Sequence, residues 1–292
     1  MDKLIHTFSI VAYDPIKEEW GVAVQSKFLA AAAVVSWAKA KAGAVATQSY
    51  ANVSYGFRGL DLMESGISAE ETIQILIKDD EDKDLRQIGL VDCRGKSSAF
   101  TGGKCHDWAG HVIGEGYACQ GNILLPGTVE AMAIKFEEAR KEGGELADWL
   151  VLALEAGQDA GGDKRGRQAA GVLVVREGGG YGGDNDRYLD LRVDDHPFPI
   201  LKLQQLVESH HLYFGQVDPN DIVPLESVIM ELQGIMHKTG HLKDKPSGFV
   251  DEFSLSALRV LVGEENLEER WKGDKKAIDQ KVVEYLRNKY AD

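Results

Sequence analysis

Residues 7–26 read TFSIVAYDPIKEEWGVAVQS, and this stretch decides the fold. Residues 8–13 are rich in β-forming side chains, and the dipeptide Asp14-Pro15 marks a turn. Glu19-Trp20-Gly21 then leads into a second apolar run, GVAVQS. The stretch therefore predicts a hairpin of two buried strands near the start of the chain.

The sequence beyond this hairpin alternates between strand-like and helix-like segments. Residues 59–78 carry apolar side chains at helical spacing, and Ser68 and Glu71 have the spacing of a capping box. Residues 30–41 are alanine-rich and fit either a loop or a short helix. The other predicted elements are strands at 43–48, 86–92, 97–101, 116–120, 171–176 and 188–193, and helices at 127–142, 146–157 and 200–211.

The order of these elements predicts the fold class. Strands and helices come in separate runs, which favours an α+β layered fold over alternating βαβ units. Two stacked sheets with helices on both outer faces would satisfy this order. Residues 215–225 (GQVDPNDIVPL) resemble a linker, and beyond them the helical segments are 227–236, 253–261 and 278–290. We therefore expect two domains, at residues 1–214 and 215–292.

Composition narrows the classes of function. The 292 residues have a formal net charge of −14 and no basic stripe, which argues against a nucleic-acid partner. No apolar run is long enough for a membrane helix, so we expect no membrane contact. The first nine residues, MDKLIHTFS, lack the apolar core of a secretory signal, and a cytoplasmic location is the resulting expectation.

Polar residues and glycines are concentrated at the ends of the predicted strands and helices. Examples are VQSK, ATQSYAN, QGN and GQDAGGDKRGRQ. Such junctions can direct several polar groups into one cleft of a rigid scaffold. The chain contains no G-x-S-x-G, HExxH or Walker A motif. His106 and His111 could bind zinc, but no cysteine pair completes a ligand set, so we predict no metal and no cofactor.

The sequence resembles family 1028 of the domains of unknown function, which belongs to the N-terminal-nucleophile (Ntn) hydrolase superfamily. The matching stretches span about residues 7–211 and include TFSIVAYDP, EWGVAVQSKFLA, GAVATQSYAN, RQIGLVD, TGGKCHDWAGH, GEGYACQGNIL, ALEAGQDAGGDKRGRQAAG and DLRVDDHP. The C-terminal residues resemble the peptidoglycan-binding domain that accompanies some members. The resemblance implies a four-layer αββα sandwich followed by a small helical domain.

The resemblance also implies a mechanism. In Ntn hydrolases the first residue of the mature chain attacks a carbonyl, and its own α-amine takes the proton. Thr7 is the candidate nucleophile. In the family pattern this threonine follows the initiator methionine, whereas here MDKLIH precedes it, so the leader must be removed before the amine can act. The alternative is that Thr7 is a β-branched residue that only begins a strand.

Two further catalytic candidates come from the same resemblance. Lys41, or Lys39, precedes the third strand and would lower the pKa of the nucleophile. Asp163 would orient the α-amine. The second strand ends in Gln25-Ser26-Lys27, without the acidic residue of proteasome-like relatives. The alternatives are a solvated surface charge for each lysine and a loop ion pair of Asp163 with a nearby arginine.

Candidate substrate-binding residues lie at the same strand ends. Asn52 or Asn122 could donate to an oxyanion. The alternative is that these amide side chains bond nearby backbone in tight turns. The full set comprises Ser26, Lys27, Gln48, Asn52, Gln120, Asn122 and Arg165.

Two hypotheses of function follow for the whole chain, and a third concerns the helical domain alone. The first is a hydrolase of amide or peptide bonds that uses Thr7. The second is a non-catalytic Ntn-like protein that holds a small amide or peptide ligand, while its helical domain contacts peptidoglycan peptide. A third hypothesis is that the helical domain serves only to assemble a homo-oligomer. For the catalytic hypothesis we expect one cleft to collect Thr7, Lys41, Asn52, Asn122 and Asp163.

Overall fold

The computed structural model describes residues 7–215 and 217–290. The chain divides into two compact units, Met1–Val207 and Glu208–Asp292. The division falls inside helix α6 (Pro199–Phe214), because its first turns pack on the core of the first unit and Leu212 and Tyr213 pack on that of the second. None of the helices in the described residues is long and apolar enough to cross a membrane.

The larger sheet of the first unit is antiparallel, with strand order β10-β9-β2-β1-β8-β7. Strand β1 (Thr7–Asp14) lies between β2 (Glu19–Ser26) and β8 (Tyr117–Asn122). The register places Thr7 opposite Ser26 on one side and opposite Asn122 on the other. The remaining strands are β7 (Gly110–Gly114), β9 (Ala169–Val175) and β10 (Arg187–Val193).

The smaller sheet packs on the inner face of the larger one. Its strands, in spatial order, are β3 (Ser36–Lys39), β4 (Gly43–Ser49), β5 (Arg86–Asp92) and β6 (Ser97–Thr101). A one-turn helix, α1 (Ala32–Val35), precedes β3. Val11, Val22 and Val24 from the larger sheet meet Ala44 and Ala46 from the smaller one in a core between the sheets. Small and β-branched side chains at these positions allow the two sheets to approach closely.

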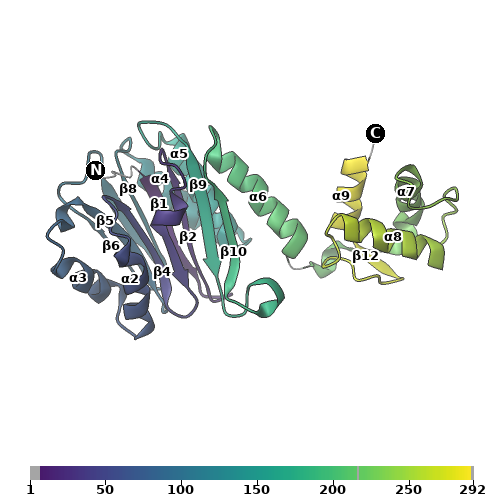
Figure 1. Cartoon of the computed structure of the whole chain (residues 1–292), viewed down its shortest axis with the longest axis horizontal. Coiled ribbons are helices and arrows are strands. Elements are labelled where there is room, and N and C mark those ends of the chain that lie inside the picture. Colours follow the sequence, from purple (N-terminus) through teal and green to yellow (C-terminus); the bar gives the residue numbers. More distant parts are fainter. Residues whose placement is uncertain (1–6, 216, 291–292) are drawn as a thin grey trace. The chain divides into compact units, whose positions relative to one another are not determined.

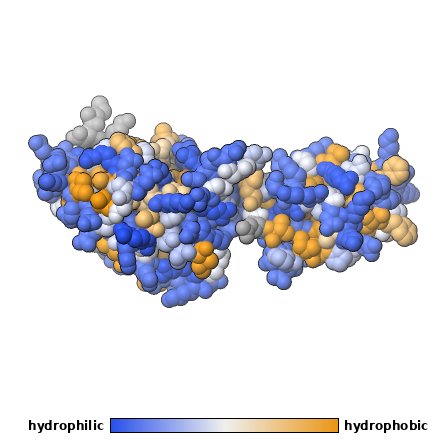
Figure 2. Space-filling view, turned by 90° about the horizontal axis from the view of Figure 1, so that it is seen from below, coloured by the Kyte–Doolittle hydropathy of each residue, from blue (hydrophilic) through white to orange (hydrophobic). Residues whose placement is uncertain are grey.

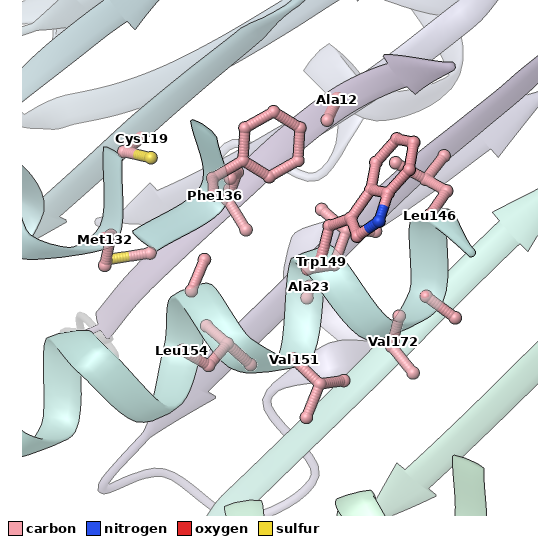
Figure 3. Close-up of a cluster of buried hydrophobic side chains, with 14 of the residues drawn as sticks. Ala12, Ala23, Cys119, Met132, Phe136, Leu146, Trp149, Val151, Leu154 and Val172 are labelled. Atoms are coloured by element: carbon pink, nitrogen blue, oxygen red, sulfur yellow. The ribbon is translucent and has the colours of Figure 1, made fainter. Parts of the chain in front are cut away.

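Helices cover both outer faces and complete four layers. Helices α2 (Ser54–Glu64) and α3 (Ala69–Lys78) pack on the smaller sheet (Figure 1). Helices α4 (Thr128–Glu142) and α5 (Leu146–Asp159) pack on the larger one. Figure 3 shows their side chains, such as Phe136 and Leu154, over the strand residues Ala12, Ala23 and Val172. The predicted α+β class and the αββα layers are confirmed.

The second unit is mainly helical. Its helices are α7 (Leu225–Lys238), α8 (Glu252–Glu264) and α9 (Gln280–Tyr290), and a short ladder joins β11 (Ile222–Pro224) to β12 (Ala277–Asp279). Leucine, isoleucine and valine side chains from all three helices form its core. A buried ion pair joins Arg270 to Asp279 at 2.6 Å. The visible surface in Figure 2 is largely hydrophilic, with apolar residues in separate small groups.

Some elements differ from the sequence predictions. The capping box of Ser68 and Glu71 is confirmed at the start of α3, and it separates α3 from α2 within the stretch that was predicted as helical. Strands β3 and β7 were missed, because both are short edge strands with half-buried residues and therefore carry a weak pattern. The ladder β11–β12 was missed for the same reason. Single-turn 3-10 helices also occur at Lys83–Leu85, Tyr181–Gly183 and Pro219–Asp221.

Gly89 illustrates how closely the sheets approach. It lies in β5 between Ala46 and Ala99, and a Cβ atom there would be 2.0 Å from Oε1 of Gln120 in the opposite sheet. Gln120 is fully buried, and its Nε2 donates to Ser9 Oγ at 2.7 Å, so it has little freedom to move aside. A glycine is therefore required at this position by space rather than by backbone conformation.

We predict that Gly89→Ala lowers the free energy of unfolding by about 1–3 kcal/mol, because the added methyl group overpacks the space between the sheets. The matched control is Gly234→Ala in the middle of α7, where a Cβ would have no atom within 4 Å. That change should instead stabilise the helical unit by about 0.5–1 kcal/mol through helix propensity. Calorimetry of the full chain measures both, and equal effects of the two variants would contradict the packing argument.

Candidate functional site at the start of the first strand

Thr7 begins β1 with its side chain between the two sheets. Side chains alternate along a strand, and Ser9 and Val11 on the same face contact the smaller sheet. Thr7 is fully buried, and its hydroxyl donates to Ser26 Oγ at 3.0 Å. The register of β1 with β8 puts Asn122 beside Thr7 on the same face. Thr7, Ser26 and Asn122 therefore form a row across three neighbouring strands.

The amide of Gln87 connects this row to the smaller sheet. Gln87 Oε1 accepts from Gln48 Nε2 at 2.9 Å and from Asn122 Nδ2 at 3.0 Å. Gln87 Nε2 donates to the backbone carbonyls of Gly110 at 3.1 Å and Gly121 at 2.8 Å. Gln48 Nε2 also reaches the carbonyl oxygen of Thr7 at 3.3 Å. These side chains are buried, and their direct hydrogen bonds link β5 and β4 to β8 and β1.

The direction of each amide in the network is fixed. Backbone carbonyls can only accept, so the nitrogen of Gln87 must face them and its oxygen must face Gln48 and Asn122. Asn122 consequently presents its nitrogen to Gln87 and directs Oδ1 elsewhere. This Oδ1 is buried and has no hydrogen-bond donor among the described residues. A buried acceptor without a partner costs about 1–3 kcal/mol, so the site has an unused acceptor beside Thr7.

A second branch of the network passes through Ser9. Its hydroxyl donates to Gln48 Oε1 at 2.6 Å and accepts from Gln120 Nε2 at 2.7 Å. The bond from Ser9 to Gln48 therefore joins the larger sheet to the smaller one. Gln120 holds the same serine from the neighbouring strand of the larger sheet. Neither side chain is exposed, and Gln120 Oε1 also has no donor in the described part of the chain.

Asp163 lies beside the end of β2, next to this row. Its buried carboxylate accepts from the backbone nitrogen of Lys27 at 3.0 Å and from Arg165, whose Nη2 is 2.9 Å away. The alternative of a loop ion pair is therefore the arrangement found. Asp163 fixes the backbone that directly follows Ser26, and no hydrogen bond joins it to Thr7. Arg165 is half-exposed, and Lys27 is exposed, with Nζ 3.5 Å from the carbonyl oxygen of Arg167.

The expectation that Lys41 lies beside Thr7 is wrong. Lys41 is in the turn before β4 and pairs with Glu177 at 2.5 Å, beyond the end of β9. Strand β4 brings Gln48, near its last residue, to Thr7, so its first residue is at the other end of the sandwich. Lys39 is equally remote and pairs with Glu64. A residue before a strand and a residue after it lie at opposite ends of that strand, so Lys41 and Gln48 cannot both be beside Thr7.

Asn52 follows β4 at the correct end but serves a different cluster. Its Nδ2 donates to Asp80 at 3.2 Å, and Tyr55 and Arg86 donate to the same carboxylate at 2.6 and 2.9 Å. Burial raises the pKa of Asp80, but these hydrogen bonds outweigh it and hold that pKa well below its usual range. Asn52 Oδ1 accepts from Ser54. Asn52 thus clamps the loop after β4 and makes no hydrogen bond to Thr7.

The structure thus brings together five predicted residues, Thr7, Ser26, Gln48, Gln120 and Asn122, and sets Asp163 beside them. Sequence reasoning missed Ser9 and Gln87. The available signal was a polar side chain inside an otherwise apolar strand, in FSIVAY and RQIGLVD. Such a residue must find a partner when it is buried.

No group of three or more potential metal-ligating side chains occurs in residues 7–215 and 217–290. Nδ1 of His111 is 2.9 Å from Thr101 Oγ1. Burial lowers the pKa of His111 and favours its neutral form. Because Gln87 Nε2 also donates to Thr101 at 3.0 Å, His111 is attached to the edge of the buried amide network.

The helical unit has a cavity of its own, of about 340 Å³, between α7 and α9. Arg287 holds Glu231 by two hydrogen bonds, at 2.5 and 2.9 Å, and Lys238 Nζ donates to the carbonyl of Tyr290 at 3.1 Å. Gly234 lines the cavity, and the space above its Cα is empty. Glycine costs about 1 kcal/mol in a helix interior, and no neighbouring atom of the described residues requires it here.

The family comparison covers the four-layer unit that contains Thr7. Residues 7–203 match the model of a "Family of unknown function (DUF1028)", and the chain belongs to this family. Residues 213–286 match a "Putative peptidoglycan binding domain".

Comparison with solved structures gives a similar result. The chain is similar to the crystal structure of a DUF1028 protein from Silicibacter pomeroyi, with 28% identity and a TM-score of 0.64. The similarity covers 72% of this chain and 88% of that one. No curated protein matches the chain.

Proposed function

We propose that this protein hydrolyses an amide or peptide bond with Thr7 as nucleophile, once cleavage of the His6–Thr7 bond has made Thr7 the first residue. The observation that carries this proposal is the partner of the threonine hydroxyl. Thr7 Oγ1 is bonded to Ser26, which is no base near neutral pH, and no carboxylate, imidazole or amine of the described residues is bonded to it. The hydroxyl thus needs a base that residues 7–215 and 217–290 do not supply.

The freed α-amine of Thr7 is such a base. Its ordinary pKa of about 8 lies close to neutral pH. The Thr7 oxygen attacks the substrate carbonyl carbon while its proton passes to the α-amine, and the resulting ammonium protonates the departing amine. An ester then joins the acyl group to Thr7. Water hydrolyses that ester, again with the amine as base, and releases the acid.

The unused acceptor of Asn122 supports this role for the amine. Neighbouring residues on paired strands have Cβ atoms about 4.5–5.5 Å apart, which is within reach of a side-chain amide. Asn122 Oδ1 lacks a donor, and an ammonium on Thr7 would supply one. Asn122 thereby becomes a residue that orients the amine, in place of the oxyanion donor that the sequence suggested. Gln48 holds the Thr7 carbonyl from the other sheet.

We further propose that the helical unit contacts peptidoglycan peptide through the cavity between α7 and α9. In a chain with a net charge of −14, the ammonium of Lys238 is bonded to the carbonyl oxygen of Tyr290 and, among residues 7–215 and 217–290, to no carboxylate. It is therefore available to a peptide carboxylate. Gly234 keeps the cavity floor free of side chains, so that a peptide backbone can approach the helix. In the alternative hypothesis this binding, without catalysis, is the function.

The proposed hydrolysis is tested by comparing chains that begin at residue 7 with the uncut protein. The trimmed chain should release amine from a member of a panel of acyl amides and muropeptides, and Thr7→Ser should retain activity. Thr7→Ala should lower kcat/KM by at least about 1,000-fold, since the nucleophile is lost. Liquid chromatography of the products measures this.

The matched control is Thr72→Ala, which removes a buried threonine hydroxyl on α3, on the outer side of the smaller sheet. This variant should hydrolyse the same amide at the rate of the trimmed parent. A nucleophilic Thr7 would be contradicted if the trimmed Thr7→Ala chain were as active as the trimmed parent. It would also be contradicted if the uncut protein, verified by mass spectrometry, were as active as the trimmed parent.

A second prediction concerns the helical unit. Gly234→Gln should fill the cavity and Lys238→Gln should remove its cation, so each should weaken sedimentation of the full chain with insoluble peptidoglycan about tenfold. Gly263→Gln in α8 is the matched control, because a Cβ there also meets no atom within 4 Å, but it lies outside the cavity. The site is ruled out if both cavity variants bind peptidoglycan as well as the parent chain does. It is also ruled out if Gly263→Gln loses as much binding as the cavity variants.

A further inference from the structure

A second cavity of the sandwich lies at the end remote from Thr7. It has a volume of about 460 Å³ and is formed by the turn after β1, the β5–β6 and β7–β8 turns, and the α4–α5 connection. Tyr13 and Asp14 line it, whereas Thr7 is at the other end of the same eight-residue strand. At about 3.3 Å per residue the two sites are roughly 23 Å apart. This cavity therefore does not belong to the Thr7 site.

Two arginines on its wall lack a carboxylate partner. Arg94, from the β5–β6 turn, donates to the carbonyl of Gly66 at 3.2 Å, and Arg140, from the last turn of α4, donates to that of Glu115 at 2.8 Å. No carboxylate in the described residues forms an ion pair with either. In a chain with 47 acidic and 33 basic residues, two guanidinium groups left unpaired on one concave wall are unexpected.

Glu71 attracts Arg94 electrostatically but forms no ion pair with it. Two other acidic residues near the wall are used elsewhere or point away. Asp14 is buried, and its Oδ1 accepts from the backbone nitrogen of Ile16 at 2.8 Å, so it is used within the turn. Glu115 is exposed and presents its carbonyl, not its carboxylate, to Arg140. Lys17 is a third cation on the wall and pairs with Glu145 at 3.3 Å.

The rest of the cavity is apolar and open. Trp149 and Tyr13 form part of the wall, and the indole nitrogen of Trp149 is bonded to the carbonyl of Gly143 at 2.7 Å. Ile16 at the turn also lines the cavity and is 90% exposed. Gly143 and Gly144 both have positive φ, and a Cβ at Gly143 would meet no atom within 4 Å. The α4–α5 connection thus leaves the cavity unobstructed.

We propose that this cavity is a binding site for a small organic anion, with Arg94 and Arg140 on its carboxylate or phosphate and the aromatic and aliphatic wall on its apolar body. Guanidinium groups match the planar, two-point geometry of such anions. A pocket of this size with apolar walls and a few convergent polar groups is typical of small-molecule sites. The site is separate from the proposed hydrolysis and does not depend on it.

The test measures binding of four probes to the full chain by isothermal titration calorimetry and ligand-observed NMR. They are 3-phenylpropionate, phenyl phosphate, the neutral 3-phenylpropionamide and inorganic phosphate. We expect one or both aryl anions to bind at least tenfold more tightly than the neutral amide and than inorganic phosphate. The preferred aryl anion then distinguishes a carboxylate ligand from a phosphate ligand.

Arg94→Gln and Arg140→Gln should each weaken binding of the aryl anion about tenfold. Arg140 also packs over the ring of Phe136, so its replacement can disturb the fold as well as the site. Arg94 lies on an exposed turn, so its replacement should leave the fold intact. Arg192→Gln is the matched control, because Arg192 lines a different cavity of about 220 Å³ and should have no effect. Equal binding of the neutral amide, an unaffected Arg94→Gln variant, or no binding of any probe at millimolar concentration overturns the proposal.

Discussion

The side-chain amide of Gln87 holds the two sheets in register at the end where Thr7 lies. It donates to carbonyls of the larger sheet and accepts from Gln48 in its own sheet and from Asn122 in the other. A shift of β5 by one residue would turn Gln87 toward α2 and α3 and place Ile88 among polar groups. Each buried amide left without partners would cost about 1–3 kcal/mol. The network therefore specifies one alignment of the sheets, and that alignment sets the surroundings of Thr7.

This constraint explains why polar residues occupy an interior that is apolar elsewhere. At the middle of the sandwich, Val11 and Val24 meet Ala44 and Ala46, and the sheets are held by close packing. At the Thr7 end, Ser9 of the larger sheet and Gln48 of the smaller one take over that function through a hydrogen bond. The arrangement satisfies most of its polar groups but leaves Oδ1 of Asn122 without a donor. In the proposed mechanism the α-ammonium of Thr7 would supply this missing donor.

Much of the fold could be predicted from the sequence, because its strands and helices follow hydrophobic patterns. The first hairpin, the capping box at Ser68 and the two helices after residue 127 are local signals that the structure preserves. Edge strands such as β3 and β7 escaped detection, since one partner strand and partial burial leave little pattern. The order of strands in each sheet depends on pairing between segments far apart in the chain, and local sequence patterns do not predict it.

The site was predicted in part for a related reason. The family resemblance identified Thr7, and polar residues at strand ends identified Gln48 and Asn122, whereas Gln87 stood in a strand that was interpreted only as a core element. Lys41 was misplaced because the family resemblance suggested a lysine before the third strand, and a residue that precedes β4 lies at the end of the sheet opposite to Gln48 and Thr7. The placement of Asp163 was anticipated, but its ion pair with Arg165 makes it a support for the loop after Ser26.

The central claim is that Thr7 becomes a nucleophile when its amine is free, and acylation by an activated ester tests it independently of the natural substrate. The chain that begins at Thr7 is mixed with p-nitrophenyl acetate, and release of nitrophenol is followed in the first turnover. The account predicts a burst of about one equivalent per chain, with the acetyl group mapped to Thr7 by tandem mass spectrometry. A trimmed Thr7→Ala chain should give no burst. A burst of equal size in that variant, or no burst in the trimmed parent, would contradict the claim.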